Sequence, residues 1–370
     1  MSRSLFMPRL MDEDNFNPQN KNAQLLLCHW PQSDWEITAL TYNAPDKRVA
    51  IREKINIIRL WRWRGWYLHL FLRYLRPYDL VFYPGVHVAD AMGLRWRRRL
   101  GFSAPLVVTL EGLVGNEERE KEYTAWAGHK VYCQYVPPDV LRRVDEMLFS
   151  ADHVIAISPF LARMGRRRYG DKFSVLPLGI DTSVFYPPRD RQPGRLKVVS
   201  AGRVESHKRP EVFLSLAEQY PEADFIWYGE GSLTGPLTSE ARKRGLKNVI
   251  FPGSKPPNQL AGAFREADIF VLPSLSEGVP KVTQEAAACG LPVVLFGHYE
   301  APSVKDGHNG FVVWDDETFM EKVGELLDNP ILVESFGRAG AEMSQGWAWD
   351  VIAPQWEDVC SRFVLGENSD

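Results

Sequence analysis

The sequence has few cysteines, and they match no metal-binding spacing. Cys28, Cys133, Cys289 and Cys360 lie far apart and form no CxxC pattern or zinc spacing. Isolated thiols of this kind are typical of a reducing compartment, where disulfide frameworks are rare. We therefore expect buried or unpaired thiols and no zinc site built on cysteine.

The sequence also lacks a long apolar run. A membrane-spanning helix needs about 20 consecutive apolar residues, and no stretch of this sequence reaches that length. The N-terminal residues carry two arginines and a short apolar patch, and no signal-peptide core follows them. We therefore expect a cytoplasmic protein, and a location on the inner face of a membrane stays open.

Length and charge divide the chain into two halves. At 370 residues it is long for one hydrophobic core, which favours two domains. Residues 1–188 hold 26 Lys and Arg against 20 Asp and Glu, and the remainder holds 18 against 27. A basic half joined to an acidic half predicts two surfaces with different partners.

Short apolar runs, bounded by turn residues and separated by helical patterns, recur in both halves. Such alternation predicts an α/β protein with two doubly wound, Rossmann-like domains that face each other across an interdomain cleft. The runs expected to form strands are Leu80–Tyr83, Leu106–Thr109, His153–Ser158, Ser174–Pro177, Leu196–Ala201, Asp224–Tyr228, Val249–Phe251, Ile269–Leu272 and Pro292–Leu295.

A polar, proline-rich stretch, Tyr186–Gly194, has the composition of an interdomain linker. We therefore predict an N-terminal Rossmann-like domain at 1–188 and a C-terminal one at 189–345. The last segment, 346–370, is predicted to form a helix that packs back toward the N-terminal domain. Its tryptophans, Trp347, Trp349 and Trp356, are typical of docking contacts rather than of chemistry.

The most informative segment, Pro273–Ala286, follows an apolar strand and opens a helix. Pro280 suits the first helical turn, where a missing N–H costs nothing, and Gly290 marks the helix end. Glu277 then lies in the loop before the helix and Glu285 lies within it. Backbone N–H groups at such a helix start attract a diphosphate, and carboxylates on either side accept hydrogen bonds from sugar hydroxyls. This layout fits a sugar nucleotide.

A plainer interpretation exists for each carboxylate taken alone. Glu277 is then a turn residue and Glu285 a solvated position on the helix. A second segment, Ser200–Pro210, follows another strand and turns at Gly202, and it too has both a functional and a plain structural interpretation. Arg203 and Lys208 emerge there at a strand end, where α/β sheets bind ligands, and could neutralise a diphosphate. As an isolated pair of cations they indicate only a surface loop.

Four motifs occur in order: Gly202-Arg203-x4-Lys208, Tyr228-Gly229-Glu230-Gly231, Glu277-x7-Glu285 and Asp306-Gly307-x-x-Gly310-Phe311. Together they resemble the retaining GT-B glycosyltransferases of family 4. The resemblance is specific over Lys197–Phe311 and continues more loosely upstream, through Val175–Phe185 and through Met7-Pro8 to Gln24.

The resemblance implies a role for each matching residue. Glu285 would bind the ribose and Glu277 the hydroxyls of the donor sugar, while Arg203 and Lys208 would hold the diphosphate and stabilise its charge as the glycosidic bond breaks. The segment Gly253-Ser254-Lys255 would lie near the base. The implied donor-binding set is Gly202, Arg203, Lys208, Tyr228, Gly229, Ser254, Lys255, Glu277, Gly278, Val279, Pro280, Lys281, Val282, Thr283 and Glu285.

The resemblance also implies an activity. Such enzymes move a hexose from a nucleotide diphosphate sugar, UDP-sugar by family preference, to a hydroxyl with retention of configuration. They need no metal and no cofactor besides the donor. The acceptor would bind the N-terminal domain and would be a glycan, a lipid-linked sugar or a small molecule, used in surface polysaccharide or glycoconjugate synthesis.

One departure from the family concerns a histidine that often follows a central strand of the N-terminal domain. This chain has Glu111 there, in Thr109–Leu113. A carboxylate could support a positively polarised anomeric carbon or act as a base, and it could equally bind a sugar hydroxyl or belong to the loop. His87 is another candidate for the cleft, although a hydrogen-bonded structural histidine accounts for it as well.

Arginines alternate with aromatic residues over Arg52–Arg76, and Arg95–Arg99 and Arg166–Arg168 add further charge. Such clusters hold helices against anionic membranes. The alternative is a helix with core aromatics and solvated arginines. No nucleic-acid recognition fold accompanies the charge, so we expect no nucleic-acid partner.

Two other functions stay open. A non-catalytic sugar-nucleotide-binding protein would keep the donor site and lose turnover, and Glu111 is the feature that favours it. A sugar-nucleotide epimerase of similar architecture would convert the donor without an acceptor. The intact pair of glutamates favours transfer over both.

Overall fold

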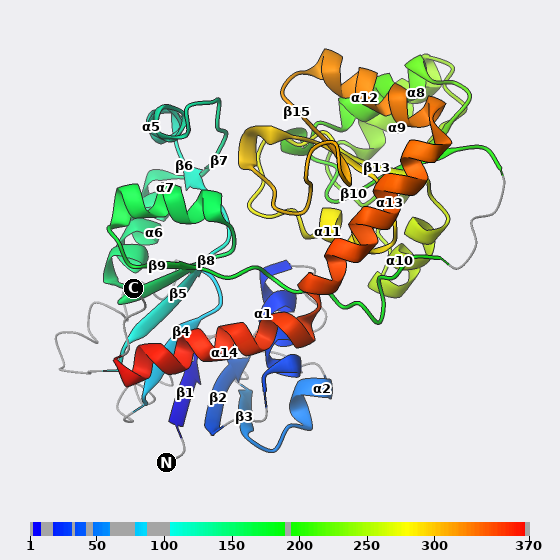
Figure 1. Ribbon diagram of the computed structural model, residues 1–370. Coiled ribbons are helices and arrows are strands. Elements are labelled where there is room, and N and C mark those ends of the chain that lie inside the picture. Colours follow the sequence, from blue (N-terminus) through cyan, green and yellow to red (C-terminus); the bar gives the residue numbers. More distant parts are fainter. Residues whose placement is uncertain are drawn as a thin grey trace. The chain divides into compact units, whose positions relative to one another are not determined.

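The computed structural model describes residues 3–8, 18–31, 34–41, 47–59, 78–86, 104–188 and 194–366 (Figure 1). Contacts within the chain divide it into two compact units. The first unit comprises Met1–Glu117, Gln134–Gly179 and Trp349–Asp370, and the second comprises Glu118–Cys133 and Ile180–Ala348.

The first unit is built on a parallel sheet with the strand order β3-β2-β1-β4-β5-β8-β9. The central strands β4 and β5 are fully buried, as expected where both faces of a parallel sheet are covered. Its strands are β1 (Arg3–Met7), β2 (Trp35–Thr41), β3 (Ile55–Arg59), β4 (Leu80–Tyr83), β5 (Leu106–Leu110), β8 (His153–Ala156) and β9 (Phe173–Val175).

Helices and one short ladder complete the first unit. The helices are α1 (Pro18–His29), α2 (Lys47–Ala50), α6 (Pro138–Ser150), α7 (Pro159–Tyr169) and α14 (Trp349–Leu365), and the ladder joins β6 (Val114–Gly115) to β7 (Gln134–Tyr135).

The C-terminal helix α14 packs within the first unit, although it is the last element of the chain (Figure 1). The Trp356 indole donates to the Pro177 carbonyl at 3.0 Å, and the Trp35 indole donates to Glu357 at 2.8 Å. Trp349 lies so close to Gly179 that a Cβ there would be 2.4 Å from the indole. The late tryptophans Trp349 and Trp356 are therefore core residues of this unit.

The second unit is built on a second parallel sheet, with the order β12-β11-β10-β13-β14-β15. Its strands are β10 (Lys197–Ala201), β11 (Asp224–Tyr228), β12 (Val249–Gly253), β13 (Ile269–Leu272), β14 (Val293–Phe296) and β15 (Gly310–Val313). Its helices are α5 (Glu117–Ala127, all but its first residue), α8 (Pro210–Gln219), α9 (Thr234–Lys243), α10 (Pro257–Arg265), α11 (Lys281–Ala288), α12 (Asp316–Asp328) and α13 (Pro330–Ser344), with the 3₁₀ turns η3 (Ser206–Lys208), η4 (Gly297–Tyr299) and η5 (Gln345–Trp347).

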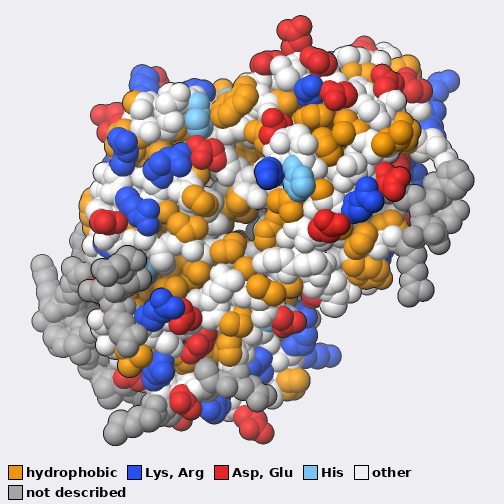
Figure 2. All heavy atoms as spheres, in the orientation of Figure 1, with side chains coloured by type: hydrophobic (Ala, Val, Ile, Leu, Met, Phe, Trp, Pro, Cys, Tyr) orange, Lys and Arg blue, Asp and Glu red, His pale blue; other side chains and the backbone are white. Residues whose placement is uncertain are grey.

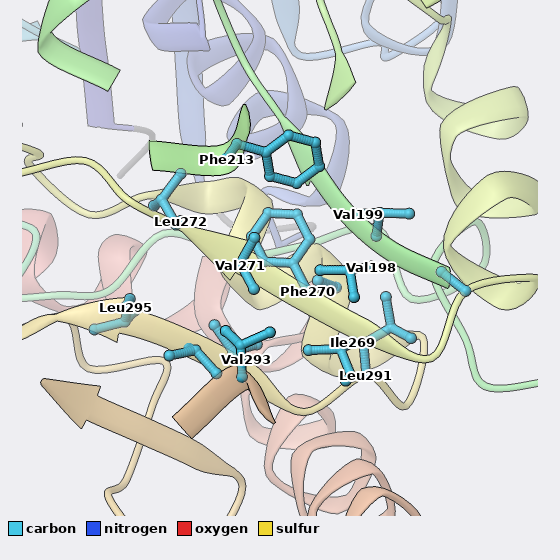
Figure 3. Packing of buried hydrophobic residues seen from close by; sticks show 14 of the residues in the cluster. Val198, Val199, Phe213, Ile269, Phe270, Val271, Leu272, Leu291, Val293 and Leu295 are labelled. Atoms are coloured by element: carbon cyan, nitrogen blue, oxygen red, sulfur yellow. The ribbon is translucent and has the colours of Figure 1, made fainter. Parts of the chain in front are cut away.

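The core of the second unit gathers on the central strands, where side chains of β10, β13 and β14 interleave (Figure 3). Val199, Phe270 and Val294 are each at most 1% exposed. Phe213 of α8 covers this layer and meets Trp227 edge to face, with ring centroids 5.4 Å apart. Because the central strands are almost entirely apolar, the charged residues of the predicted site lie at the strand ends and in the loops that follow.

The prediction of two Rossmann-like parallel sheets is confirmed, and the differences are local. The expected strand His153–Ser158 ends at Ala156, because the Ser158 hydroxyl accepts from the Leu161 amide and begins α7. The expected strand Ser174–Pro177 ends at Val175. The pattern of apolar runs did not single out β1, β2, β3, β6, β7 or β15.

The division into units also differs from the predicted domain limits. Residues 118–133 contact the second unit, so the first unit is not the continuous segment predicted at 1–188. The second unit starts at Ile180, ahead of the proline-rich linker, and α14 begins at Trp349 rather than at 346. Among the described helices, none combines the length and the apolar character that a bilayer span requires.

Candidate functional site

The predicted site residues of the second unit follow the carboxyl ends of β10, β11, β12 and β13. In a parallel sheet these ends lie at one edge, where α/β proteins bind ligands. The loop after β10 carries Arg203 and Lys208, and the loop after β13 carries Glu277. Contacts between these loops show which of the predicted residues the fold brings together.

Glycines allow the loops after β10 and β11 to touch through their backbones. Gly202 and Gly229 have positive φ values of 139° and 151°, a region that favours glycine. A Cβ on Gly229 would lie 1.9 Å from the Gly202 carbonyl oxygen, and one on Gly231 would lie 2.3 Å from that of Val204. The Val204 amide also donates to the Glu230 carbonyl at 3.1 Å. The first motif is therefore held in place by the second.

The turn between Arg203 and Lys208 is anchored by Glu205. Its carboxylate accepts from the Ser232 amide at 2.9 Å and from the Ser232 hydroxyl at 2.6 Å. These two hydrogen bonds lower the pKa of Glu205, so the anchor is ionised at neutral pH. The anchored turn delivers Lys208 to the end of η3.

Lys208 and Glu277 form an ion pair, with the lysine ammonium donating to the glutamate carboxylate. Both side chains are nearly buried, 14% and 12% exposed respectively. With so little solvent around it, either charge alone would pay a large desolvation cost. The attraction between the two opposite charges offsets this cost. Burial, followed by the positive charge of Lys208, lowers the pKa of the adjacent His207, which therefore stays neutral.

Tyr299 is a further residue near Glu277 that the sequence patterns did not single out. Its side chain is fully buried, and its hydroxyl has no hydrogen-bond partner among the described residues. Burial raises the pKa of this phenol well above its usual value, and the Glu277 charge raises it further. Tyr299 follows β14 as Glu277 follows β13, so its place at a strand end was the signal that could have revealed it.

The loop before α11 is tied to the loop after β10. The buried hydroxyl of Ser274 lies 3.2 Å from the carbonyl oxygens of His207 and of Ser276. This contact sets the backbone beside Lys208 against the backbone beside Glu277. The loop that carries Lys208 and the loop that carries Glu277 are therefore held against each other.

The start of α11 differs in part from the prediction. Pro280 lies just before the helix rather than in its first turn. The Thr283 amide donates to the Pro280 carbonyl at 2.9 Å, and the Thr283 hydroxyl donates to the same oxygen at 2.6 Å and lies 2.6 Å from the Ser303 hydroxyl. The Thr283 amide is thus bonded within the helix start, whereas the amides of the helix start were predicted to attract a diphosphate. Glu285 lies farther along the same helix, half-buried.

The segment predicted near the base, Gly253-Ser254-Lys255, lies beside the end of β11. The Lys255 ammonium lies 5.7 Å from the centre of the Tyr228 ring. The Glu230 carboxylate accepts from the Ser254 amide at 3.4 Å, and Gly253 turns the chain with a φ of 86°. These contacts bring Tyr228, Ser254 and Lys255 together.

Glu111 directly follows β5 in the first unit and is half-buried. It therefore belongs to a different unit from Glu277. The other candidate, His87, lies outside the described residues, as do Arg95–Arg99 and most of the predicted basic aromatic stretch.

Three described members of the basic clusters form contacts inside the first unit. The Arg52 guanidinium donates to the carbonyls of Cys28 and Trp30. Arg166 donates to the Phe173 carbonyl at 2.8 Å, and Arg168 lies 3.7 Å from Asp145. On the face drawn in Figure 2, basic and acidic side chains are interspersed. Among the described residues, no three His, Cys, Asp or Glu side chains converge on a metal site.

Two family models match the chain. "Glycosyl transferases group 1" matches residues 187–343, and "Glycosyltransferase Family 4" matches residues 23–184. D-inositol 3-phosphate glycosyltransferase of Arthrobacter sp. is 31% identical over 302 residues, which cover 75% of this chain and 68% of that relative. Alpha-galactosylglucosyldiacylglycerol synthase of Streptococcus pneumoniae is 25% identical over 241 residues, covering 57% of this chain and 61% of that protein. The match thus spans less than two thirds of the pneumococcal relative.

Solved structures share the fold at low identity. Sucrose-phosphate synthase of Thermosynechococcus elongatus superposes with a TM-score of 0.78 at 19% identity, over 98% of this chain and 100% of that one. Anabaena HepE in complex with UDP and glucose superposes with a TM-score of 0.72 at 15% identity, again over 98% and 100%.

Proposed function

Because the chain belongs to the family 4 glycosyltransferases, of GT-B type, we propose that it transfers a hexose from a nucleotide diphosphate sugar to an acceptor hydroxyl. The proposed donor is a UDP-sugar, and the new bond keeps the anomeric configuration of the donor. The proposed acceptor is a glycan, a lipid-linked sugar or a small molecule, bound by the first unit and used in surface polysaccharide or glycoconjugate synthesis.

The ion pair between Lys208 and Glu277 carries this proposal. A diphosphate that arrives at the loop after β10 competes with Glu277 for the lysine ammonium, because it brings two negative charges against the single charge of the carboxylate. The freed carboxylate then accepts hydrogen bonds from the hydroxyls of the sugar. One buried pair therefore supplies a cation for the leaving diphosphate and a carboxylate for the transferred hexose.

In the mechanism that we propose, the cations of the site take the place of a metal. Arg203 and Lys208 stabilise the negative charge that develops on the diphosphate as the glycosidic bond breaks. The acceptor hydroxyl attacks from the face on which the diphosphate leaves, which gives retention. Glu111 of the first unit is assigned to the acceptor or to the anomeric carbon. Related proteins support the choice of ligands, since HepE was solved with UDP and glucose and the relatives are named for inositol phosphate and diacylglycerol substrates.

A contact with an anionic membrane surface is a further part of the proposal. The arginines at positions 52, 166 and 168 form contacts within the first unit, so we expect them to contribute less to the membrane contact. The contact therefore depends on other basic side chains of the first unit, such as the exposed Arg142 and Arg167. Co-sedimentation with vesicles that contain or lack anionic lipid measures it.

The test is a thermal-shift panel of UDP, GDP, dTDP and ADP, alone and as sugar conjugates, combined with an assay of sugar transfer. We expect one nucleotide to raise the melting temperature of the wild type, and much less that of Glu285→Ala. Glu277→Ala should retain nucleotide diphosphate binding and lose transfer by roughly 100-fold, as when one transition-state contact is removed.

Absence of a shift with every nucleotide would withdraw the proposed donor site. Transfer by Glu277→Ala at the wild-type rate would remove the role given to this carboxylate. Donor binding without transfer or slow hydrolysis would instead favour a non-catalytic sugar-nucleotide-binding protein, the alternative that Glu111 keeps open.

A further inference from the structure

Residues 118–133 leave the first unit and contact the second. The chain passes out of the first unit after Glu117 and returns to it at Gln134. We call residues 118–133 the strap. It consists of most of α5 and of the loop that follows this helix.

Hydrogen bonds within the strap join its loop to its helix. The Glu120 carboxylate accepts from the Lys130 ammonium at 2.9 Å and from the Cys133 amide at 3.2 Å. The Thr124 hydroxyl accepts from the Val131 amide at 3.1 Å. These bonds fix the loop on its own helix, so its backbone carbonyls have defined positions.

Two side chains of the second unit donate to carbonyls of the strap loop. The Ser276 hydroxyl donates to the Tyr132 carbonyl at 3.1 Å. His298 Nδ1 lies 2.9 Å from the Lys130 carbonyl oxygen, which can only accept, so this nitrogen carries the proton. Burial lowers the pKa of His298, which keeps the ring neutral with this donor in place.

Aromatic contacts and one hydrogen bond secure the same loop. The Tyr132 ring meets His298 edge to face at 5.2 Å, and the His129 ring meets Trp314 at 5.0 Å. His129 Nε2 lies 3.0 Å from the Glu300 carboxylate. Glu300 has a φ of 44°, a left-handed conformation that residues other than glycine seldom adopt, and such strain persists only where surrounding contacts hold it.

The contacts of the strap adjoin Glu277 from two directions. Ser276 directly precedes Glu277, and the carbonyl of Ser276 lies 3.2 Å from the Ser274 hydroxyl that joins this loop to His207. His298 and Glu300 flank Tyr299, the phenol whose pKa is raised first by burial and second by the charge of Glu277.

We propose that the strap is a positioning element for Glu277, acting through Ser276 and His298. This inference rests on the proposed function, in which Glu277 binds the hydroxyls of the donor sugar. The hydrogen bonds of the strap loop reach Ser276, His298 and Glu300, residues that flank Glu277 and Tyr299. Its loss should therefore impair sugar transfer more than nucleotide binding.

The experiment uses the full-length chain with the variants Ser276→Ala, His298→Leu and His298→Asn. Amide hydrogen exchange is measured without ligand, UDP affinity by calorimetry and transfer by steady-state kinetics with the donor that the panel identifies. For Ser276→Ala we expect exchange at 274–279 and 128–133 to rise, and kcat to fall, by about 3- to 10-fold, the effect of one hydrogen bond. UDP affinity should stay close to that of the wild type.

His298→Leu should act like Ser276→Ala, whereas His298→Asn keeps an N–H donor and should restore most of the loss. His308→Ala, at an exposed histidine of the same unit, is the matched control. Wild-type exchange and turnover in Ser276→Ala and His298→Leu, or equal impairment in both His298 variants, would overturn the proposal. Because exchange is measured without donor, a wild type that is protected at 274–279 but transfers no sugar would refute the proposed function and not the strap.

Discussion

At the scale of single residues, the ion pair of Lys208 and Glu277 makes the two side chains energetically dependent on each other. Each is nearly buried and compensates the charge of the other. Removal of one therefore leaves an uncompensated charge, and removal of both does not. The two residues should be coupled even when no donor is bound.

A double-mutant cycle measures this coupling. We expect Lys208→Ala to weaken UDP binding about 10- to 100-fold, as for a lost charge-assisted hydrogen bond, and to destabilise the second unit. Lys208→Ala combined with Glu277→Ala should destabilise it less than the sum of the single changes. Lys243→Ala, with a side chain 76% exposed on α9, is the control. Additive unfolding free energies would contradict the mutual compensation.

At the scale of secondary-structure elements, the loops after β10 and β11 touch so closely that there should be no room for an added side-chain atom between them. Gly229→Ala would place a Cβ 1.9 Å from the Gly202 carbonyl oxygen at a φ of 151°. We expect a fall of several degrees in the melting temperature and loss of UDP binding, because the loop that carries Arg203 must move. Gly235→Ala on α9 meets nothing within 4 Å and should change neither quantity. An unaltered Gly229→Ala protein would show that the loops do not need this contact.

The secondary-structure elements were largely predictable from the sequence, whereas the contacts between them were not. The strands β10, β11 and β13 were predictable because each is a short apolar run ending at glycine or proline, and the site motifs follow them directly. Contacts between distant segments leave no such local pattern. The hydrogen bond of Ser276 to Tyr132 joins residues 144 positions apart, and nothing in the segment 118–133 marks it as part of the second unit.

The hydrogen bonds of Thr283 and Arg52 could not be predicted from the sequence for a related reason. Both residue types suit a ligand or a membrane as well as they suit an internal carbonyl, and only the fold decides which acceptor is near. Thr283 bonds to Pro280 and Ser303, and Arg52 bonds to Cys28 and Trp30. Their predicted roles were drawn from composition and resemblance, which do not record these acceptors.

For the whole molecule, the first unit should lose stability in mild acid. Burial, with the charge of Lys172 second, lowers the pKa of His153 from 6.5 to about 4, and His153 Nε2 lies 2.9 Å from the Ser174 hydroxyl. In the unfolded chain His153 binds a proton below pH 6.5, whereas in the folded unit it does so only below about pH 4. Acid in this range therefore favours the unfolded chain. This group should therefore remove about 3 kcal/mol of stability as the pH falls through that window.

Urea unfolding at several pH values, followed by tryptophan fluorescence, measures this loss. His153→Asn should flatten the pH dependence between pH 7 and pH 4 relative to the wild type, whereas His308→Asn at an exposed site should leave it unchanged. Equal slopes in the wild type and in His153→Asn would exclude His153 as the source.

The place of α14 has a consequence for the order in which the chain can fold during synthesis. Trp349 and Trp356 belong to the core of the first unit, yet the ribosome makes them after every strand of both sheets. The second unit is therefore complete while the first still exposes the apolar surface around Gly179 and Phe82 that these indoles cover. We therefore expect the half of the molecule that is synthesised first to finish folding last, and its unfinished core to be open to chaperone binding during that interval.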